Sequence, residues 1–317
     1  MTFRDDHVYT GVVSITVLFT VLSLIQYTWL ETAQYVLLAV GTVVIGIPHG
    51  ATDDHVYRTL AGRRGMPWFY GLYLLIALLY GVVWAVAPGF SLLLFLVISV
   101  YHFGQSNLFY TALPESSGGK KGIYLSWGAF NLATPILFRY EEAAPVIEAI
   151  LGWSPVSIAA AHAAAPWVST SLLLLNLGIL FVLFVRNRLA LRDLLREIAG
   201  FGVLFALYAT APLFVSFIVY WAFWHSLNSA IEIAGTWTGR SAGQQMAAFF
   251  RAAAPLTAVT FAGMALIFAL TQAYGSREAL VAMFFIIIAA ITLPHMVIME
   301  MLYRRRNQDS TPSPQQL

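Results

Sequence analysis

The sequence contains no cysteine, and only 10% of its 317 residues are charged. Without cysteine the chain forms no disulfide, holds no iron–sulfur cluster and uses no thiolate nucleophile. A soluble domain averages about 25% charged residues, whereas 59% of this chain is hydrophobic. The basic residues are spread over separate segments, so we predict no nucleic-acid partner. We predict an all-α, polytopic membrane helix bundle.

Apolar runs long enough to cross a bilayer, which takes about 20 helical residues, occur along most of the chain. They cover residues 9–29, 33–57, 67–86, 89–110, 122–139, 168–187, 212–236, 250–273 and 278–304. A weaker tenth segment, 197–210, is short but follows a basic loop and ends at Pro212. The N-terminal residues MTFRDDHVYT lead into the first run without a small-residue cleavage site, so we interpret this run as a retained span.

The basic residues test this count, because lysine and arginine collect in cytoplasmic loops. With ten spans every basic cluster falls on one side, whereas omitting 197–210 would move the last two clusters to the other side. The clusters contain Arg58, Arg63, Arg64, Lys120, Lys121, Arg186, Arg188, Arg192, Arg196, Arg240, Arg251, Arg304, Arg305 and Arg306. We therefore predict about ten transmembrane helices in the cell (plasma) membrane, with both termini cytoplasmic.

The spans leave little room for other domains. We expect residues 1–304 to form a single transmembrane catalytic domain, followed by a polar, disordered cytoplasmic tail at 305–317. The acidic stretch RYEEAAPVIEAI begins a long loop on the outer side that extends to Pro166.

Four of the seven histidines lie inside predicted spans and share a depth: His49, His102, His225 and His295. Their spans all run from the outside to the cytoplasm. Each histidine precedes the cytoplasmic end by roughly eight to eleven residues, or about 12–17 Å at the helical rise. Ionisable residues in a membrane are costly and usually face the bundle interior. We interpret the four as one layer in the inner half of the membrane.

Four imidazoles at one depth indicate a metal site, and such a ligand set suits iron, copper, zinc or nickel. A metal near lipid without thiolates indicates redox or oxygen chemistry on an apolar substrate. Two alternatives remain open from the residues alone, namely helix packing through hydrogen bonds and a proton relay.

Prolines and a carboxylate stand near these histidines. Pro48 and Pro294 each directly precede a histidine, and a proline kink can aim the ring into the bundle. Asp53 follows His49 by four residues, so we expect it on the same helix face, one turn below. We expect Asp53 to accept a hydrogen bond from the second imidazole nitrogen of His49.

Glu232 lies seven residues after His225, and we interpret it either as support for the site or as a charge at the helix end. Aromatic residues in spans usually pack or anchor at the interface. Those beside His102 and His225 can also wall a tunnel for a long, flat, apolar ligand. They are Tyr101, Phe103, Trp221 and Trp224.

Four short motifs follow one another along the chain: IPHGATDD, YHFG, WHSLNS and LPHM. Across ten predicted spans, from about residue 40 to residue 300, they resemble the Brp/Blh family of bacterial and archaeal membrane enzymes; PHGA-x-D is the most specific part. The resemblance implies cleavage of β-carotene at its central double bond with dioxygen. The products would be two retinals for microbial rhodopsins, and the cofactor would be non-haem iron, Fe(2+), held by histidines.

Residue by residue, the resemblance assigns iron-ligand roles to His49, His102 and His225. It also implies a histidine four residues after His225, where this chain has Ser229. Either His295 completes the set, or water or a carboxylate completes three histidines, or the activity is lost or changed. The shared depth favours His295, so we predict that His49, His102, His225 and His295 are the catalytic iron ligands.

The leading hypothesis is a carotenoid-cleaving dioxygenase that takes its substrate sideways from the lipid. One alternative is another lipid-modifying metalloenzyme with two metal ions, which needs short-spaced histidine pairs. A second is a proton-coupled secondary transporter, and a third is a non-catalytic assembly factor for a carotenoid or retinal protein.

Overall fold

The computed structural model describes residues 6–25, 29–62, 65–111, 113, 117–271 and 277–310, and within these ranges it contains helices and no strand. The all-α prediction is therefore confirmed. The helices are α1 (Asp6–Leu24), α2 (Trp29–Gly41), α3 (Ile47–Gly50), α4 (Asp53–Ala61), α5 (Met66–Val86), α6 (Pro88–Leu108), α7 (Gly118–Phe138), α8 (Tyr140–Leu151), α9 (Ile158–Val185), α10 (Leu191–Thr210), α11 (Leu213–Ile218), α12 (Leu227–Ala234), α13 (Ala242–Thr271) and α14 (Arg277–Ser310).

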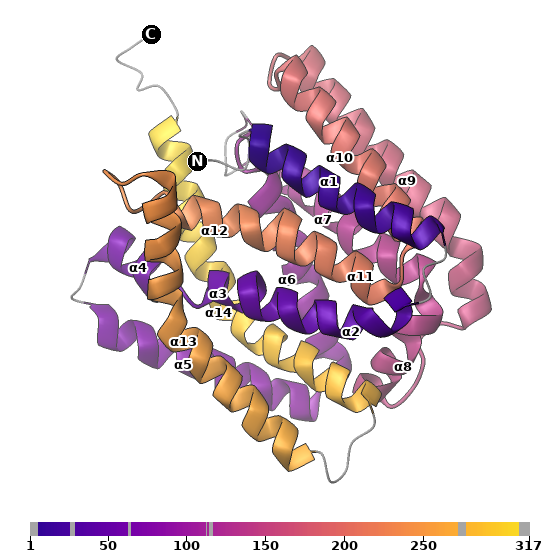
Figure 1. The fold of residues 1–317 in the computed structure, drawn as a ribbon, viewed down its shortest axis with the longest axis horizontal. Coiled ribbons are helices and arrows are strands. Elements are labelled where there is room, and N and C mark those ends of the chain that lie inside the picture. The colour runs from indigo at the N-terminus through magenta and orange to yellow at the C-terminus, as the bar shows by residue number, and fades with distance from the viewer. Residues whose placement is uncertain are drawn as a thin grey trace.

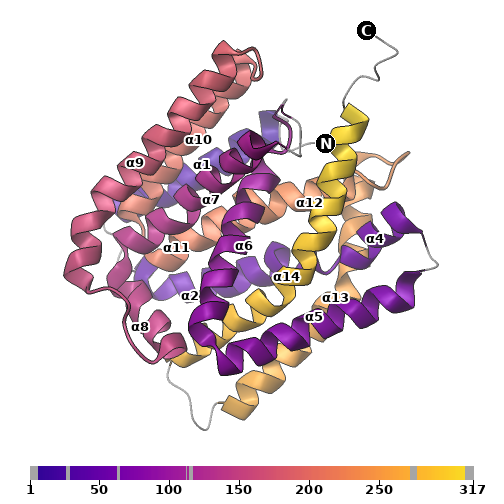
Figure 2. The same ribbon diagram turned by 180° about the vertical axis from the view of Figure 1, so that it is seen from behind.

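The helices form one crossed bundle (Figures 1 and 2). Helices α1, α9 and α10 lie at one side, α4, α5 and α13 lie at the opposite side, and α14 crosses the middle. The start of α1 and the end of α14 lie near the same edge of the bundle. The described ends of the chain therefore lie near one another.

Among the described residues, seven segments are long and apolar enough to cross a membrane. They are Asp6–Leu24, Trp29–Ala61, Met66–Val86, Pro88–Leu108, Ile158–Val185, Ala242–Leu266 and Leu280–Arg305. The other three predicted spans, 122–139, 197–210 and 212–236, fall on α7, on α10 and on the stretch from α11 to α12. These helices carry more charged, aromatic or polar side chains, so the count of ten and the cytoplasmic location of the termini stay predictions.

Two helices approach each other closely through glycine. A Cβ atom on Gly104 of α6 would overlap the backbone of Tyr124, and one on Gly128 of α7 would overlap the backbone of Val100. Only glycine permits this contact, which fixes α6 against α7. The packing matters for function because α6 carries His102 two residues before Gly104.

Several helices are interrupted next to predicted site residues. A π-helical segment, η1 (Thr42–Gly46), precedes Pro48, and another, η3 (Val219–Ser226), contains His225. The chain leaves the helical conformation at Ala51 and Thr52, between α3 and α4. By contrast, Pro294 lies inside α14, which continues on both sides of it. Irregular winding of this kind is frequent at functional sites.

The ends of the predicted segments differ in how far they are described. Helix α14 continues to Ser310, so the predicted tail boundary at residue 305 falls inside a helix. Residues 311–317 of that tail, and Arg63 and Arg64 of the basic clusters, lie outside the described residues. The stretch predicted as an outer loop contains α8 and the first turns of α9.

Candidate metal centre

Each predicted histidine comes from a different segment of the bundle. His49 lies on α3, His102 near the end of α6, His225 in η3 and His295 on α14. All four residues are buried, with at most 5% of the surface of each residue exposed. Residues separated by up to 246 positions in sequence (49 to 295) therefore meet in the interior.

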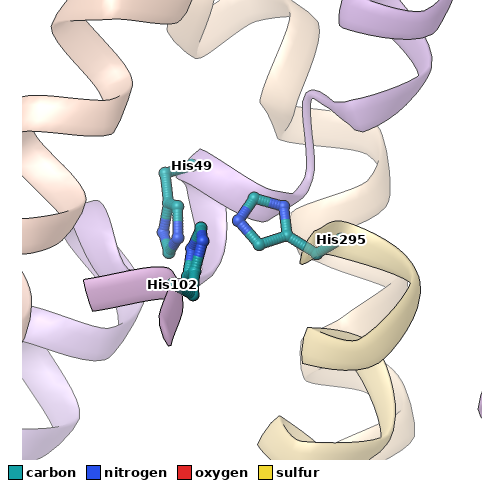
Figure 3. A group of neighbouring side chains, drawn as sticks. All are labelled: His49, His102 and His295. Carbon is teal, nitrogen blue, oxygen red and sulfur yellow. The ribbon is translucent and has the colours of Figure 1, made fainter. Parts of the chain in front are cut away.

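Three of the imidazoles converge on one point, and their rings face one another in Figure 3. One nitrogen from each of His49, His102 and His295 lies within 4.8 Å of the other two. The ring of His295 is nearly perpendicular to both others, at 86° to His49 and 88° to His102. Metal–nitrogen bonds of about 2.0–2.1 Å hold ligand nitrogens about 3–4 Å apart, so the spacing is close to that of a metal site.

His225 forms the remaining side of the cluster. Its ring centroid lies 4.8 Å from that of His102 and 5.3 Å from that of His49. Its Nδ1 atom lies 2.9 Å from the hydroxyl oxygen of Ser106. This hydrogen bond fixes the ring and leaves Nε2 as the atom that can bind a metal.

Several nitrogens of the cluster lack a protein partner. Both ring nitrogens of His102 and the Nε2 of His295 are buried without a hydrogen bond to the described residues. An unsatisfied buried polar atom costs about 1–3 kcal/mol, and such atoms call for a bound ion or water. A cation at the meeting point would bind one nitrogen of His102 and one of His295, so the residues present fit a metal ion.

The structure changes the partner of Asp53. Its buried carboxylate lies beside His295, with Oδ1 2.7 Å from Nδ1 of that ring, whereas Nδ1 of His49 bonds to the backbone carbonyl of Gly46. The predicted pairing of Asp53 with His49 requires a continuous helix. The chain turns at Ala51 and Thr52, so Asp53 no longer lies below His49 on one face.

Tyr73 on α5 belongs to the same hydrogen-bonded group. Its hydroxyl donates to Oδ2 of Asp53 at 2.9 Å and lies 3.3 Å from the carbonyl oxygen of Ile291. The carboxylate of Asp53 is therefore held from both sides, by a tyrosine and by His295. Sequence reasoning missed Tyr73, because nothing in the spacing of α5 shows which helix it faces.

Ser229 and Glu232 lie away from the histidines. Ser229 is fully buried, and its hydroxyl lies 3.4 Å from that of Tyr303 on α14. Glu232 lines a separate small cavity together with Tyr9 and Glu197. Of the two interpretations of Glu232, its position agrees with a charge near the helix end.

An apolar cavity of about 400 Å³ adjoins the cluster. All four histidines line it, together with Phe103 and Trp221. Its volume lies within the usual range for ligand pockets, roughly 300–1,000 Å³. The cavity can therefore hold an apolar molecule directly against the histidine nitrogens.

The other two predicted ligand-binding aromatics have different surroundings. The hydroxyl of Tyr101 lies 3.3 Å from Oε2 of Glu300, which also accepts a hydrogen bond from Gln105. The indole nitrogen of Trp224 donates to Thr16 on α1 at 2.9 Å. Neither residue is among those that line the cavity.

A buried cluster of four histidines beside an apolar cavity, inside a bundle of membrane-type helices, is the arrangement of an integral membrane protein with a candidate metal site next to a candidate site for an apolar ligand. The sequence matches the family described as beta-carotene 15,15'-dioxygenase over residues 40–303, a range that includes all four histidines. The chain belongs to this family, and the resemblance seen in its motifs is confirmed.

Two relatives show the extent of the similarity. Beta-carotene 15,15'-dioxygenase from the uncultured marine bacterium 66A03 is 26% identical over 267 residues, which cover 83% of this chain and 91% of the relative. The probable beta-carotene 15,15'-dioxygenase Blh of Halobacterium salinarum is 26% identical over 297 residues, covering 86% of this chain and 85% of the relative. No solved structure matches the chain.

Proposed function

We propose that this protein is a membrane-embedded non-haem iron dioxygenase that cleaves β-carotene at its central double bond. The observation that carries the proposal is the set of buried histidine nitrogens on an apolar cavity that have no hydrogen-bond partner among the described residues, in a chain of the beta-carotene 15,15'-dioxygenase family. One oxygen atom of O2 is added to each carbon of the double bond. The bond breaks and two retinal aldehydes form, so atoms and electrons balance without a further reductant.

His49, His102, His225 and His295 would hold the iron. Iron, when bound, supplies the redox chemistry that lets dioxygen react. The protein supplies the ligands, their orientation and a dry site. Three of the rings are held through Nδ1: that of His49 by the carbonyl of Gly46, that of His295 by Asp53, and that of His225 by Ser106. Each of these hydrogen bonds leaves Nε2 as the nitrogen that can bind the metal.

The cavity positions the substrate. Its lining is largely apolar, and Phe103 and Trp221 offer flat surfaces beside the histidines. A conjugated polyene is flat and apolar, so it can pack along these rings with one bond next to the centre. The position of the polyene then decides which double bond is cleaved. The retinal produced would pass to a retinal-binding membrane protein such as a microbial rhodopsin.

The experiment is expression in cells that accumulate β-carotene, followed by pigment extraction and metal analysis of the purified protein. We expect loss of β-carotene, appearance of retinal, and about one iron per chain. Unchanged pigment, with confirmed expression and iron supply, would reject this substrate. Stoichiometric iron without cleavage would point to a different oxidation, and protein without iron would favour the transporter or assembly-factor alternatives.

A further inference from the structure

The histidine cavity reaches the lipid-facing surface of the bundle. Its lining includes Leu74 on α5 and Val259 on α13, whose side chains are 59% and 68% exposed. Both residues lie within candidate membrane spans, Met66–Val86 and Ala242–Leu266. In a bilayer, exposed side chains in these spans would contact the acyl chains. The cavity therefore has a mouth that opens into the membrane.

The two helices at this mouth are anchored to different neighbours. Helix α5 packs against α14 and α6, whereas α13 packs against α3, α12 and α14. Helices α5 and α13 are not among the closely packed pairs of the described residues. Between them, α14 contributes Ile288, Ile291 and Thr292, one face of a helix, to the wall. The gap is thus a slot between two helices, with α14 along its inner side.

The shape of the substrate gives this slot a role. β-carotene is a symmetrical polyene with a ring at each end. When its central double bond lies at the histidines, two equal halves must extend away from that point in different directions. Because the cavity continues to the membrane between Leu74 and Val259, one half has an apolar path through the slot.

We infer that the slot between α5 and α13 is the lateral entrance for β-carotene and that one end of the bound molecule occupies it. This inference rests on the proposed function and adds the route. Leu74 and Val259 are then the residues that decide how readily the polyene reaches the centre, and neither touches the histidine nitrogens.

The test uses bulky substitutions at the mouth in the full-length protein. Leu74→Trp and Val259→Trp should narrow the slot, whereas Leu72→Trp and Leu266→Trp are matched controls on the same two helices. Leu72 and Leu266 are 56% and 61% exposed but are not among the cavity-lining residues. All four changes replace lipid-facing side chains, so the interior packing is preserved.

Initial rates are measured in proteoliposomes over a range of β-carotene contents, together with iron content. We expect the mouth variants to raise the apparent KM roughly five-fold or more at unchanged iron content, and the controls to stay within about two-fold of the parent chain. If the parent cleaves β-carotene and the mouth variants keep its apparent KM, the entrance is wrong and the proposed function stands.

A second readout does not depend on cleavage. The proteins are purified from carotenoid-accumulating cells grown without iron, and the β-carotene that co-purifies is measured per mole of protein. The mouth variants should retain less pigment than the controls. If the parent chain does not cleave β-carotene, the proposed function fails. The comparison of bound pigment between mouth variants and controls still shows whether the slot between α5 and α13 is the entrance. Equal pigment in all variants, or none in the parent, would overturn it.

Discussion

His295 differs from the other predicted ligands in the partner of its Nδ1 atom. Its Nδ1 atom faces the carboxylate of Asp53 at 2.7 Å, whereas those of His49 and His225 face a backbone carbonyl and a hydroxyl group. A carboxylate partner makes an imidazole a stronger donor to a metal than a neutral partner does. His295 should therefore contribute strongly to metal affinity, although it does not occupy the position at which the family resemblance implies the fourth histidine.

Replacement of His295 by alanine should abolish both iron retention and cleavage. Loss of a partner outside the ligand set already lowers affinity or activity by about 10–100-fold, so removal of a ligand should exceed that range. The measurements are iron content per chain and retinal formation. His162→Ala is the control, because His162 is about half exposed and bonds to Glu141 rather than to the centre. Full iron content in His295→Ala would remove it from the ligand set.

The hydrogen bonds that hold His295 through Asp53 and Tyr73 can be tested separately. Asp53→Asn and Tyr73→Phe should both weaken iron binding, Asp53→Asn by about 10–100-fold and Tyr73→Phe by less, because Tyr73 acts only through Asp53. Iron competition titration gives the affinities, and excess iron should restore much of the cleavage rate. Tyr80→Phe is the matched control on α5, since its hydroxyl bonds to the backbone of Ser91. Equal iron affinity in all three variants would contradict the role of Tyr73.

The sequence predicts the four clustered histidines better than it predicts the residues that form hydrogen bonds with their rings. A shared depth separates His49, His102, His225 and His295 from the other histidines, and the structure brings these four rings together. The four-residue spacing predicts the wrong histidine partner for Asp53, because the chain turns between them. The turn residues, Ala51 and Thr52, are neither proline nor glycine and so do not indicate the turn. Tyr73 lies on a helix whose rotation about its axis is set only by packing.

At the scale of elements, the contact between α6 and α7 decides where His102 lies. Gly104→Ala and Gly128→Ala place a methyl group against the backbone of the facing helix, which cannot move aside as a flexible side chain can. Overpacking costs about 1–3 kcal/mol and occasionally more. We expect each of these two variants to lose stability by an amount at or above the upper end of that range.

Thermal unfolding in detergent and iron content measure this effect. Both variants should unfold at lower temperature and retain less iron, because α6 moves with His102. Gly122→Ala on α7 is the control, since nothing lies within 4 Å of its added methyl group. It should be neutral or gain up to about 1 kcal/mol from helix propensity. Unchanged stability in Gly104→Ala and Gly128→Ala would mean that the helices are not held this closely.

The bounds of a helix can be predicted from the sequence where its apolar run is continuous. Helices α5 and α6 coincide with the predicted runs 67–86 and 89–110 to within two residues, whereas α9 begins ten residues before the predicted start at residue 168. The π-helical segments η1 and η3 were not predicted, because one extra residue per turn leaves the apolar pattern almost unchanged.

For the whole molecule, the distribution of arginine and lysine predicts which ends face the cytoplasm. The absence of cysteine makes a direct test possible, because an introduced cysteine is the only thiol in the chain. In intact cells, Trp153→Cys between α8 and α9 should react with a membrane-impermeant maleimide. Ser241→Cys between α12 and α13 should react only after the cells are opened. Both parent side chains are exposed. The reverse pattern would invert the predicted topology.

The arrangement of helices in space is the part that no local pattern determines. Segment α14 lies along α5, α8 and α4, which are distant in sequence. Apolar periodicity shows that each helix is buried somewhere, but the choice of neighbours depends on shape across the whole bundle. The apolar cavity and its mouth arise from that choice, so they emerge only from the three-dimensional structure.

The winding of η3 has a consequence for how the centre can be altered. A π-helical turn contains one residue more than an α-helical turn, and each residue of an α-helix turns the chain by about 100°. Deleting one residue between Val219 and Trp224 would let the segment return to regular α-helical winding, and His225 would keep nearly the same direction relative to α11, because a π-helical turn holds its extra residue within the turn. The same holds for η1 and His49. Two of the four histidines thus lie in or just after a turn that holds an extra residue. A single-residue deletion there should disturb the direction of the ring less than a deletion in a regular α-helix, which would turn it by about 100°.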